Sequence, residues 1–220
     1  EDGYGINEKL IKNAYDSGID TILTCDNGIS AYNQVEYAKS LGMNIIITDH
    51  HEVPFEETDG KREYIVPNAD AVVNCPYPFK ELCGAMVAYQ LISALFETEG
   101  IGKNELYKLL PYAAIATVCD VVDLKGENRI IVKQGIKKLK DCNDIGINAL
   151  INACKLDKNN LSSYQFGFVI GPCLNASGRL DTAKRATELL DCIDTQKAEV
   201  LAKELVELNA ERKDMTNEGA

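Results

Sequence analysis

Two short runs of β-branched and aliphatic residues, at positions 19–24 and 44–48, limit the possible folds more than any other feature of this sequence. Each run has the length of a buried strand, and a segment with helical periodicity lies between them. Strands that are apolar throughout and joined by a helix are typical of a parallel sheet covered by helices on both faces. The sequence therefore predicts an α/β fold, in which residues 64–66 and 71–73 supply one or two further strands.

Helical periodicity occupies most of the remaining chain. One helix is expected over residues 7–17, and another from Ser30, which we expect to cap it, to about Leu41. After about residue 80 the strand signal disappears. The helices predicted there are 84–98, 104–118, 129–141, 145–154, 162–170 and 181–191.

A last helical segment, at about 195–217, is charged except for one narrow apolar stripe. The stripe consists of Ala198, Leu201, Leu205 and Leu208. A helix with so narrow a stripe more often bridges two domains than lies in a core, so we expect a connecting helix here.

Charge and cysteine content exclude several classes of protein. Lys and Arg number 23 against 34 Asp and Glu, which gives a formal net charge of −11, so the surface as a whole does not attract nucleic acid or anionic membranes. The apolar runs are far shorter than the roughly 20 residues of a membrane span, and no secretory signal is visible. The eight cysteines form no Cys-x-x-Cys pair. We expect buried free thiols in a reduced, cytoplasmic protein without structural zinc.

Polar side chains gather where the two predicted strands end. Asp26 follows the first strand, and the chain's only histidines, His50 and His51, follow the second. In an open parallel sheet ligands bind at the carboxyl edge, so Asp26 and His50 are expected side by side there. Asp120 ends a later apolar segment and offers a further carboxylate.

This combination of Asp and His predicts a metal site. It suits Mn²⁺ or Mg²⁺ better than zinc, and such an ion neutralises a phosphate and lowers the pKa of a bound water. Two other interpretations stay open. Asp26-Asn27-Gly28 is also a pattern for a turn or a helix cap, and adjacent histidines also occur as satisfied polar contacts.

A set of motifs resembles those of the RecJ family of single-strand-specific DNA exonucleases, within the DHH phosphoesterase superfamily. The segment Thr48-Asp49-His50-His51 is similar to the signature of the superfamily. The other motifs are Gly3-Tyr4-Gly5, Cys25–Ser30, Cys83–Tyr89, Ala116–Val122 and Gly171–Leu180. Their order and spacing agree with the family from residue 1 to about 190.

The resemblance implies a role for each matching residue at the metal site. Asp26, His50 and Asp120 match metal ligands, and Asp26 is the carboxylate that bridges two Mn²⁺ or Mg²⁺ ions in the family. His51 matches a histidine near the scissile phosphate that assists catalysis. Asp49 matches a supporting carboxylate, and a role in orienting the site fits its chemistry.

The resemblance also implies a substrate site. Asn175, Ser177 and Arg179 match a loop that holds substrate phosphate, and the guanidinium fork of Arg179 suits phosphate oxygens. The alternative for Arg179 is a surface ion pair with Asp181.

Two parts of the family pattern lie outside the sequence. An Asp-x-Asp motif is expected upstream of residue 1, and a second domain after residue 220. We interpret residues 1–80 as the Rossmann-like α/β half of a DHH domain without its first strand, 81–192 as its helical part and 193–220 as the connecting helix. Because two ligand carboxylates are then missing, we expect the 220-residue chain to be inactive, or nearly so, on its own.

The function implied by the resemblance is hydrolysis of single-stranded DNA from the 5′ end to mononucleotides, in DNA repair and recombination, with no membrane partner. One alternative is a DHH phosphodiesterase for short oligonucleotides or cyclic dinucleotides, which the matches at 81–89 and 171–180 disfavour. Another is a non-catalytic replication scaffold, which the intact metal-site residues disfavour. The sequence upstream of residue 1 would discriminate between enzyme and scaffold.

Overall fold

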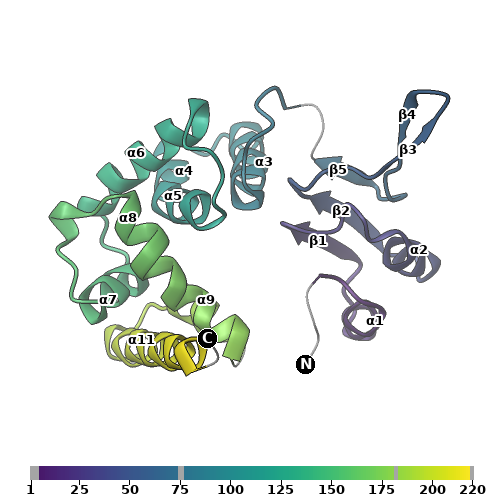
Figure 1. The fold of residues 1–220 in the computed structure, drawn as a ribbon. Coiled ribbons are helices and arrows are strands. Elements are labelled where there is room, and N and C mark those ends of the chain that lie inside the picture. Colours follow the sequence, from purple (N-terminus) through teal and green to yellow (C-terminus); the bar gives the residue numbers. More distant parts are fainter. Residues whose placement is uncertain (1–4, 74–76, 181–182, 219–220) are drawn as a thin grey trace. The chain divides into compact units, whose positions relative to one another are not determined.

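The computed structural model describes residues 5–73, 77–180 and 183–218, and at 179–180 and 216–218 it describes the backbone alone. The chain divides into two compact units, Glu1–Lys103 and Asn104–Ala220. Strands belong to the first unit, and the second is helical (Figure 1). The limits of the DHH domain that the sequence suggests, at 80 and 192, stay a prediction.

The first unit contains the predicted parallel sheet. Its strands are β1 (Thr21–Cys25), β2 (Asn44–Thr48) and β5 (Ala71–Val73), in the order β1-β2-β5. The register pairs Cys25 with Thr48, so β1 and β2 end level with each other. Residues that follow the two strands are thereby brought to the same edge of the sheet.

Two helices, α1 (Glu8–Asp16) and α2 (Tyr32–Ser40), cover one face of this sheet. The core on that face consists of Ile11, Val35, Ala38, Met43, Ile45 and Ile47. Leu23 points to the opposite face, because side chains alternate along a strand, and it is 57% exposed. The expectation that both faces are covered is therefore wrong at β1, which is an edge strand of the described sheet.

The start of α2 differs from the prediction. The helix begins at Tyr32 after Ala31, with no side-chain cap, so the expectation that Ser30 caps it is wrong. The reason is a preceding turn, in which Ala31 N donates to Gly28 O at 3.0 Å. This turn leads the chain from the end of β1 into the helix without a side-chain acceptor.

A hairpin replaces the strand expected at 64–66. Its strands are β3 (Phe55–Thr58) and β4 (Lys61–Tyr64), which pair antiparallel. They are joined by Asp59 and Gly60, both with positive φ (53° and 71°), as a two-residue hairpin turn requires. The hairpin is charged and mostly exposed, and its signal was the Asp-Gly pair rather than an apolar run.

Helices account for the regular structure in the described residues after 80, as expected. The bounds are α3 (Gly84–Thr98), α4 (Lys103–Tyr107), α5 (Leu110–Cys119), α6 (Gly126–Lys140), α7 (Ile145–Ala153), α8 (Ser163–Gln165), α9 (Gly171–Leu180), α10 (Lys184–Leu190) and α11 (Thr195–Glu218). A 3₁₀ turn spans Lys158–Asn160, and a π-helix, Phe166–Ile170, joins α8 to α9. The single helix predicted at 104–118 is two helices, since Pro111 lies in the first turn of α5.

The long helix α11 is part of the core of the second unit. Ala198, Leu201 and Leu205 are buried there, and α11 packs against α7 and α9. The expectation that the stripe bridges domains rather than lying in a core is therefore wrong. Whether α11 also leads into a further domain stays a prediction.

Two further expectations concern membranes and thiols. Among the described helices, each is too short or too polar to cross a bilayer. The seven described cysteines are free, but only Cys83 and Cys173 are buried, and Cys25 is exposed at the end of the edge strand β1. The expectation of buried thiols therefore fails for Cys25, and Cys75 lies outside the described residues.

Candidate metal centre

The turn after β1 holds Asp26 in an unusual backbone conformation. Asp26 has φ = 63°, in the left-handed region that Asp tolerates better than most residues. Its amide donates to Thr48 O at 2.9 Å and so continues the β1–β2 ladder by one residue. The buried Thr24 hydroxyl donates to Asn27 O at 2.7 Å and closes the turn. The position of Asp26 is thus fixed by the backbone.

The expected proximity of Asp26 and His50 is confirmed. His50 Nε2 lies 3.1 Å from Asp26 Oδ1, and the two side chains are 18% and 50% exposed. One ligand atom from each of Asp26, His50 and His51 lies within 4.8 Å of the others. A carboxylate oxygen and two imidazole nitrogens at this separation can share one divalent ion, since such ligands bind at about 2.0–2.2 Å.

Asp49 organises the two histidines. It is 1% exposed and accepts from the amides of His50 (2.8 Å), His51 (3.2 Å) and Ile29 (3.0 Å). Burial raises the pKa of Asp49, but the hydrogen bonds from Ile29, His51 and His50 outweigh burial and hold its pKa below the ordinary value. Asp49 is therefore a buried carboxylate anion.

The ring of His51 is oriented by the same carboxylate. His51 Nδ1 lies 2.6 Å from Asp49 Oδ1. Because an ionised carboxylate only accepts, Nδ1 carries the proton, and Nε2 is the acceptor nitrogen of the neutral ring. The His51 side chain is 60% exposed, so its ring faces solvent rather than the core.

Gly84 is a site residue that the sequence alone did not reveal. It opens α3, which lies beyond the arrowheads of the strands in Figure 1. A Cβ at Gly84 would be 2.2 Å from Asp26 Oδ1, so only glycine lets the carboxylate lie against the helix start. The positive end of the helix dipole also favours a carboxylate there. The motif Cys83–Tyr89 contained this glycine, but its contact is 58 residues away in sequence.

Asp120 ends α5 in the second unit. It is the C-cap residue of α5, and its amide donates to Ala116 O at 2.9 Å. Asp26 and His50 belong to the first unit. The approach of Asp120 to these two residues therefore stays a prediction.

The segment expected to hold phosphate is helical. Asn175, Ser177 and Arg179 lie in α9, so the expectation of a loop is wrong. Asn175 is exposed, whereas Ser177 is buried and its hydroxyl donates to Leu174 O at 3.3 Å, inside the helix. The Arg179 side chain and Asp181 lie outside the described residues, so neither interpretation of Arg179 is decided.

Asn175 has a basic neighbour that the sequence did not suggest. A cavity of about 120 Å³ in the second unit is lined by Cys119, Gly167, Gly171, Pro172, Asn175 and Arg212. Arg212 comes from α11 and donates from Nη2 to Asn209 Oδ1 at 3.1 Å. An exposed amide and a guanidinium are thus combined at one cavity, although 37 residues separate them in sequence.

Comparison with known proteins decides the family. The model described as the DHH family, N-terminal domain, matches residues 4–117, just over half of the chain. This chain belongs to the DHH family. The signature at Asp49, His50 and His51 lies within the matched region, so the family match and the geometry describe the same site.

Within the DHH family, the chain is similar to RecJ proteins. It is 38% identical to the single-stranded-DNA-specific exonuclease RecJ of Escherichia coli K12, over 98% of this chain and 38% of that protein. It is 39% identical to RecJ of Bacillus subtilis 168, over 99% of this chain and 26% of that protein. The chain thus spans less than two fifths of the length of these relatives.

Solved structures show the same similarity. RecJ of Thermus thermophilus in complex with Mn²⁺ superposes with a TM-score of 0.79 at 28% identity, over 96% of this chain and 30% of the other. An exonuclease RecJ bound to manganese gives a TM-score of 0.82 at 31% identity, over 97% and 52%. The α/β fold class predicted from the sequence is confirmed.

Proposed function

We propose that this chain forms part of the catalytic core of an exonuclease that hydrolyses phosphodiester bonds of single-stranded DNA. The observation that carries the proposal is the convergence of Asp26, His50 and His51 within 4.8 Å, in a chain of the DHH family whose relatives are RecJ exonucleases. The direction, from the 5′ end, and the mononucleotide product come from the family resemblance.

The donor set fits Mn²⁺ or Mg²⁺, the ions present in the solved RecJ structures. Asp26 and His50 would hold the ion, and Asp120 is proposed as a further ligand. When bound, the ion supplies charge that neutralises phosphate oxygens and lowers the pKa of a water nucleophile. Asp26 contributes its carboxylate from a fixed backbone position, against the start of α3.

His51 acts on the substrate side in this proposal. Asp49 holds the proton on Nδ1 and stabilises the positive charge of the ring when Nε2 also gains a proton. In this proposal the ion is held without His51, whose doubly protonated ring would donate from Nε2 to a phosphate oxygen near the cluster. Asp49 is buried and its carboxylate accepts from backbone amides, so its role in this proposal is to position His51.

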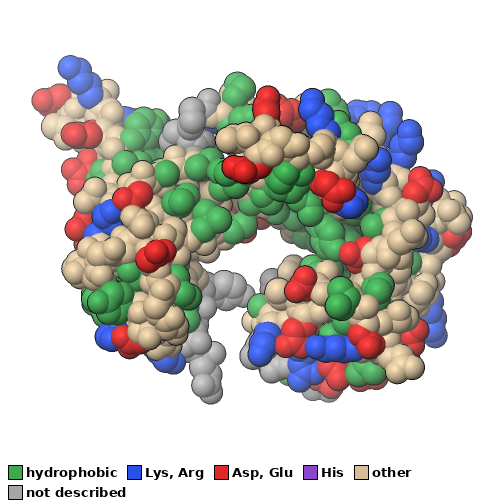
Figure 2. Space-filling model, turned by 180° about the vertical axis from the view of Figure 1, so that it is seen from behind, with side chains coloured by type: hydrophobic (Ala, Val, Ile, Leu, Met, Phe, Trp, Pro, Cys, Tyr) green, Lys and Arg blue, Asp and Glu red, His purple; other side chains and the backbone are tan. Residues whose placement is uncertain are grey.

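The second unit would contribute phosphate contacts. Asn175 is exposed at a cavity that Arg212 also lines, and Arg179 follows four residues later on α9. Acidic and basic side chains are intermixed on the face shown in Figure 2, which fits recognition by a local site rather than by overall charge. We place the protein in the cytoplasm, in accord with the free thiols of its seven described cysteines. The expected inactivity of the 220-residue chain on its own stays a prediction.

The test is a digestion of labelled DNA by the protein expressed from its full open reading frame. With Mn²⁺, single-stranded DNA should yield mononucleotides from the 5′ end, duplex DNA should be resistant, and chelation should stop the reaction. Asp26→Asn should lower the rate by at least about 100-fold, and Asp16→Asn, at an exposed aspartate of α1, should not. Unchanged turnover in Asp26→Asn would contradict the proposal. A strong preference for dinucleotides or cyclic dinucleotides would favour a short-substrate phosphodiesterase instead.

A further inference from the structure

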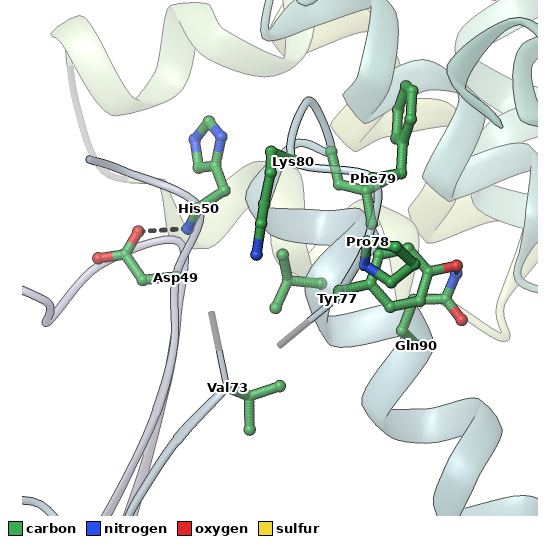
Figure 3. A pocket seen from close by; sticks show the side chains of 10 residues that line it. Asp49, His50, Val73, Tyr77, Pro78, Phe79, Lys80 and Gln90 are labelled. Carbon is green, nitrogen blue, oxygen red and sulfur yellow. Dashed lines mark hydrogen bonds between the residues drawn. The ribbon is translucent and has the colours of Figure 1, made fainter. Parts of the chain in front are cut away.

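Within the first unit, a cavity of about 270 Å³ adjoins the cluster of Asp26, His50 and His51 (Figure 3). It is lined by Asp49, His50, Val73, Tyr77, Pro78, Phe79, Lys80, Leu82, Val87 and Gln90. His50 is therefore shared, because it lines the cavity and also lies 3.1 Å from Asp26. A ligand group in the cavity would therefore lie next to an ion or phosphate bound at the cluster.

The walls combine apolar surface with a few polar groups. Val73, Leu82 and Val87 supply aliphatic surface, and Tyr77 and Phe79 supply rings. Such a lining, with few and well-placed polar groups, is typical of small-molecule sites. The aliphatic and aromatic part of the walls favours contact with the face of a flat, weakly polar ring.

The polar groups are placed on two sides. Gln90 Nε2 donates to Tyr77 Oη at 3.1 Å, which fixes both side chains on the wall opposite Asp49 and His50. Figure 3 shows the Lys80 side chain extending into the space between these walls. The tyrosine hydroxyl, the amide and the ammonium group provide both donors and acceptors for the edge of a ring.

The size of the cavity limits the occupant. Its volume of about 270 Å³ lies just below the roughly 300–1,000 Å³ range of ligand sites. This space admits one base with part of its sugar and excludes a base pair.

We propose that this cavity binds the unpaired nucleobase of the nucleotide whose phosphate lies at the Asp26–His50–His51 cluster. The proposal rests on the proposed function, because the cluster must hold a phosphate. Its consequence is a requirement for an intact, unpaired base at that nucleotide. Apolar walls contact the face of any base, so the sequence preference is weak.

The experiment compares two ligands that differ only in the base. Thymidine 5′-monophosphate and deoxyribose 5-phosphate are titrated calorimetrically, with saturating Mn²⁺, into the protein expressed from its full open reading frame. The nucleotide should bind at least about tenfold more tightly, as stacking and burial of one base predict. Equal affinities would overturn the proposal.

Variants locate the effect. Val87→Trp and Gln90→Trp, on neighbouring turns of the α3 face that lines the cavity, should each remove the advantage of the nucleotide and leave the affinity for deoxyribose 5-phosphate unchanged. Ile193→Trp, at a position 91% exposed in the second unit, is the matched control and should bind both ligands as the wild type does. The melting temperature and Mn²⁺ affinity of each variant check that it folds. An unchanged nucleotide advantage in both folded cavity variants would overturn the proposal.

The readout is independent of hydrolysis. If DNA is digested but the two ligands bind equally, the cavity proposal fails and the exonuclease proposal stands. If no DNA is digested but the nucleotide binds more tightly and the cavity variants abolish the difference, the subsite stands without the proposed activity. Failure of both ligands to bind would overturn the subsite.

Discussion

The carboxyl edge of the sheet and helix α9 are two regions that the sequence assigned to one active site, and they are built differently. At the sheet edge, Asp26 and His50 lie 24 residues apart and are brought within 3.1 Å by strand register. In α9, Asn175 and Ser177 lie close in sequence but differ in exposure, because a helix turns them to different sides. The positions of side chains that follow neighbouring strands are therefore easier to predict from the sequence than those of side chains in a short motif on a helix.

Among the variants that test this comparison, we expect the largest loss of activity from a substitution of Gly84. Gly84→Ala introduces a Cβ 2.2 Å from Asp26 Oδ1, so the carboxylate or the start of α3 must move. We expect activity to fall by about 100-fold, the cost of a misplacement of roughly 1 Å, together with weaker Mn²⁺ binding. The measurements are the rate of DNA digestion and a Mn²⁺ titration.

Gly102→Ala is the matched control for Gly84→Ala. Nothing lies within 4 Å of the position of its Cβ, and its φ is not in the left-handed region. It should keep wild-type activity and Mn²⁺ affinity. Equal behaviour of the two alanine variants would show that the contact between Gly84 and Asp26 does not matter.

Asp49→Asn should have the next largest effect. An amide presents only one oxygen where the carboxylate accepts from Ile29, His50 and His51, so we expect a stability loss of about 1–3 kcal/mol and a 10- to 100-fold loss of activity. Denaturant unfolding and digestion rates measure the two effects. A variant with wild-type activity would remove the positioning role of Asp49.

The same residue gives a pH dependence. The pKa of Asp49 is lowered in the folded protein, so its charge stabilises the fold above the unfolded pKa of about 3.9, and this contribution is lost as pH falls through the lower folded pKa. Unfolding measured between pH 3 and pH 6 should therefore show a smaller loss of stability toward low pH in Asp49→Asn than in the wild type. Parallel curves would contradict the assignment.

The smallest effect is expected in α9. Asn175→Ala removes one neutral hydrogen-bonding group from an exposed position, so affinity for single-stranded DNA should fall by roughly 2- to 10-fold with Mn²⁺ affinity unchanged. Asn152→Ala, at an exposed asparagine of α7, is the control and should leave both unchanged. A loss of Mn²⁺ affinity in Asn175→Ala would remove the contrast between the two regions.

The parts of the fold that were predicted correctly have strong local signals. The strand at 44–48 and the helix at 84–98 were predicted at their observed limits, since a continuous apolar run and a long periodic segment each favour one structure. The hairpin with Asp59 and Gly60 was missed, because its charged strands gave no apolar pattern.

Only part of the candidate site could be predicted from local sequence patterns. The proximity of Asp26 and His50 was predicted from two strand ends, and the roles proposed for Asp49 and His51 come from a family signature. The contact between Gly84 and Asp26 and the cavity shared by Asn175 and Arg212 depend on how distant segments pack. No pattern within one segment contains that information.

The central claim is that the sheet edge holds a divalent ion through Asp26 and His50. The most direct measurement is the Mn²⁺ affinity of the protein expressed from its full reading frame, compared with Asp26→Asn, His50→Gln and the control Asp16→Asn. We predict that the first two variants each weaken binding by at least about tenfold, and that Asp16→Asn binds as the wild type does. Equal Mn²⁺ affinity in all four proteins would contradict the claim.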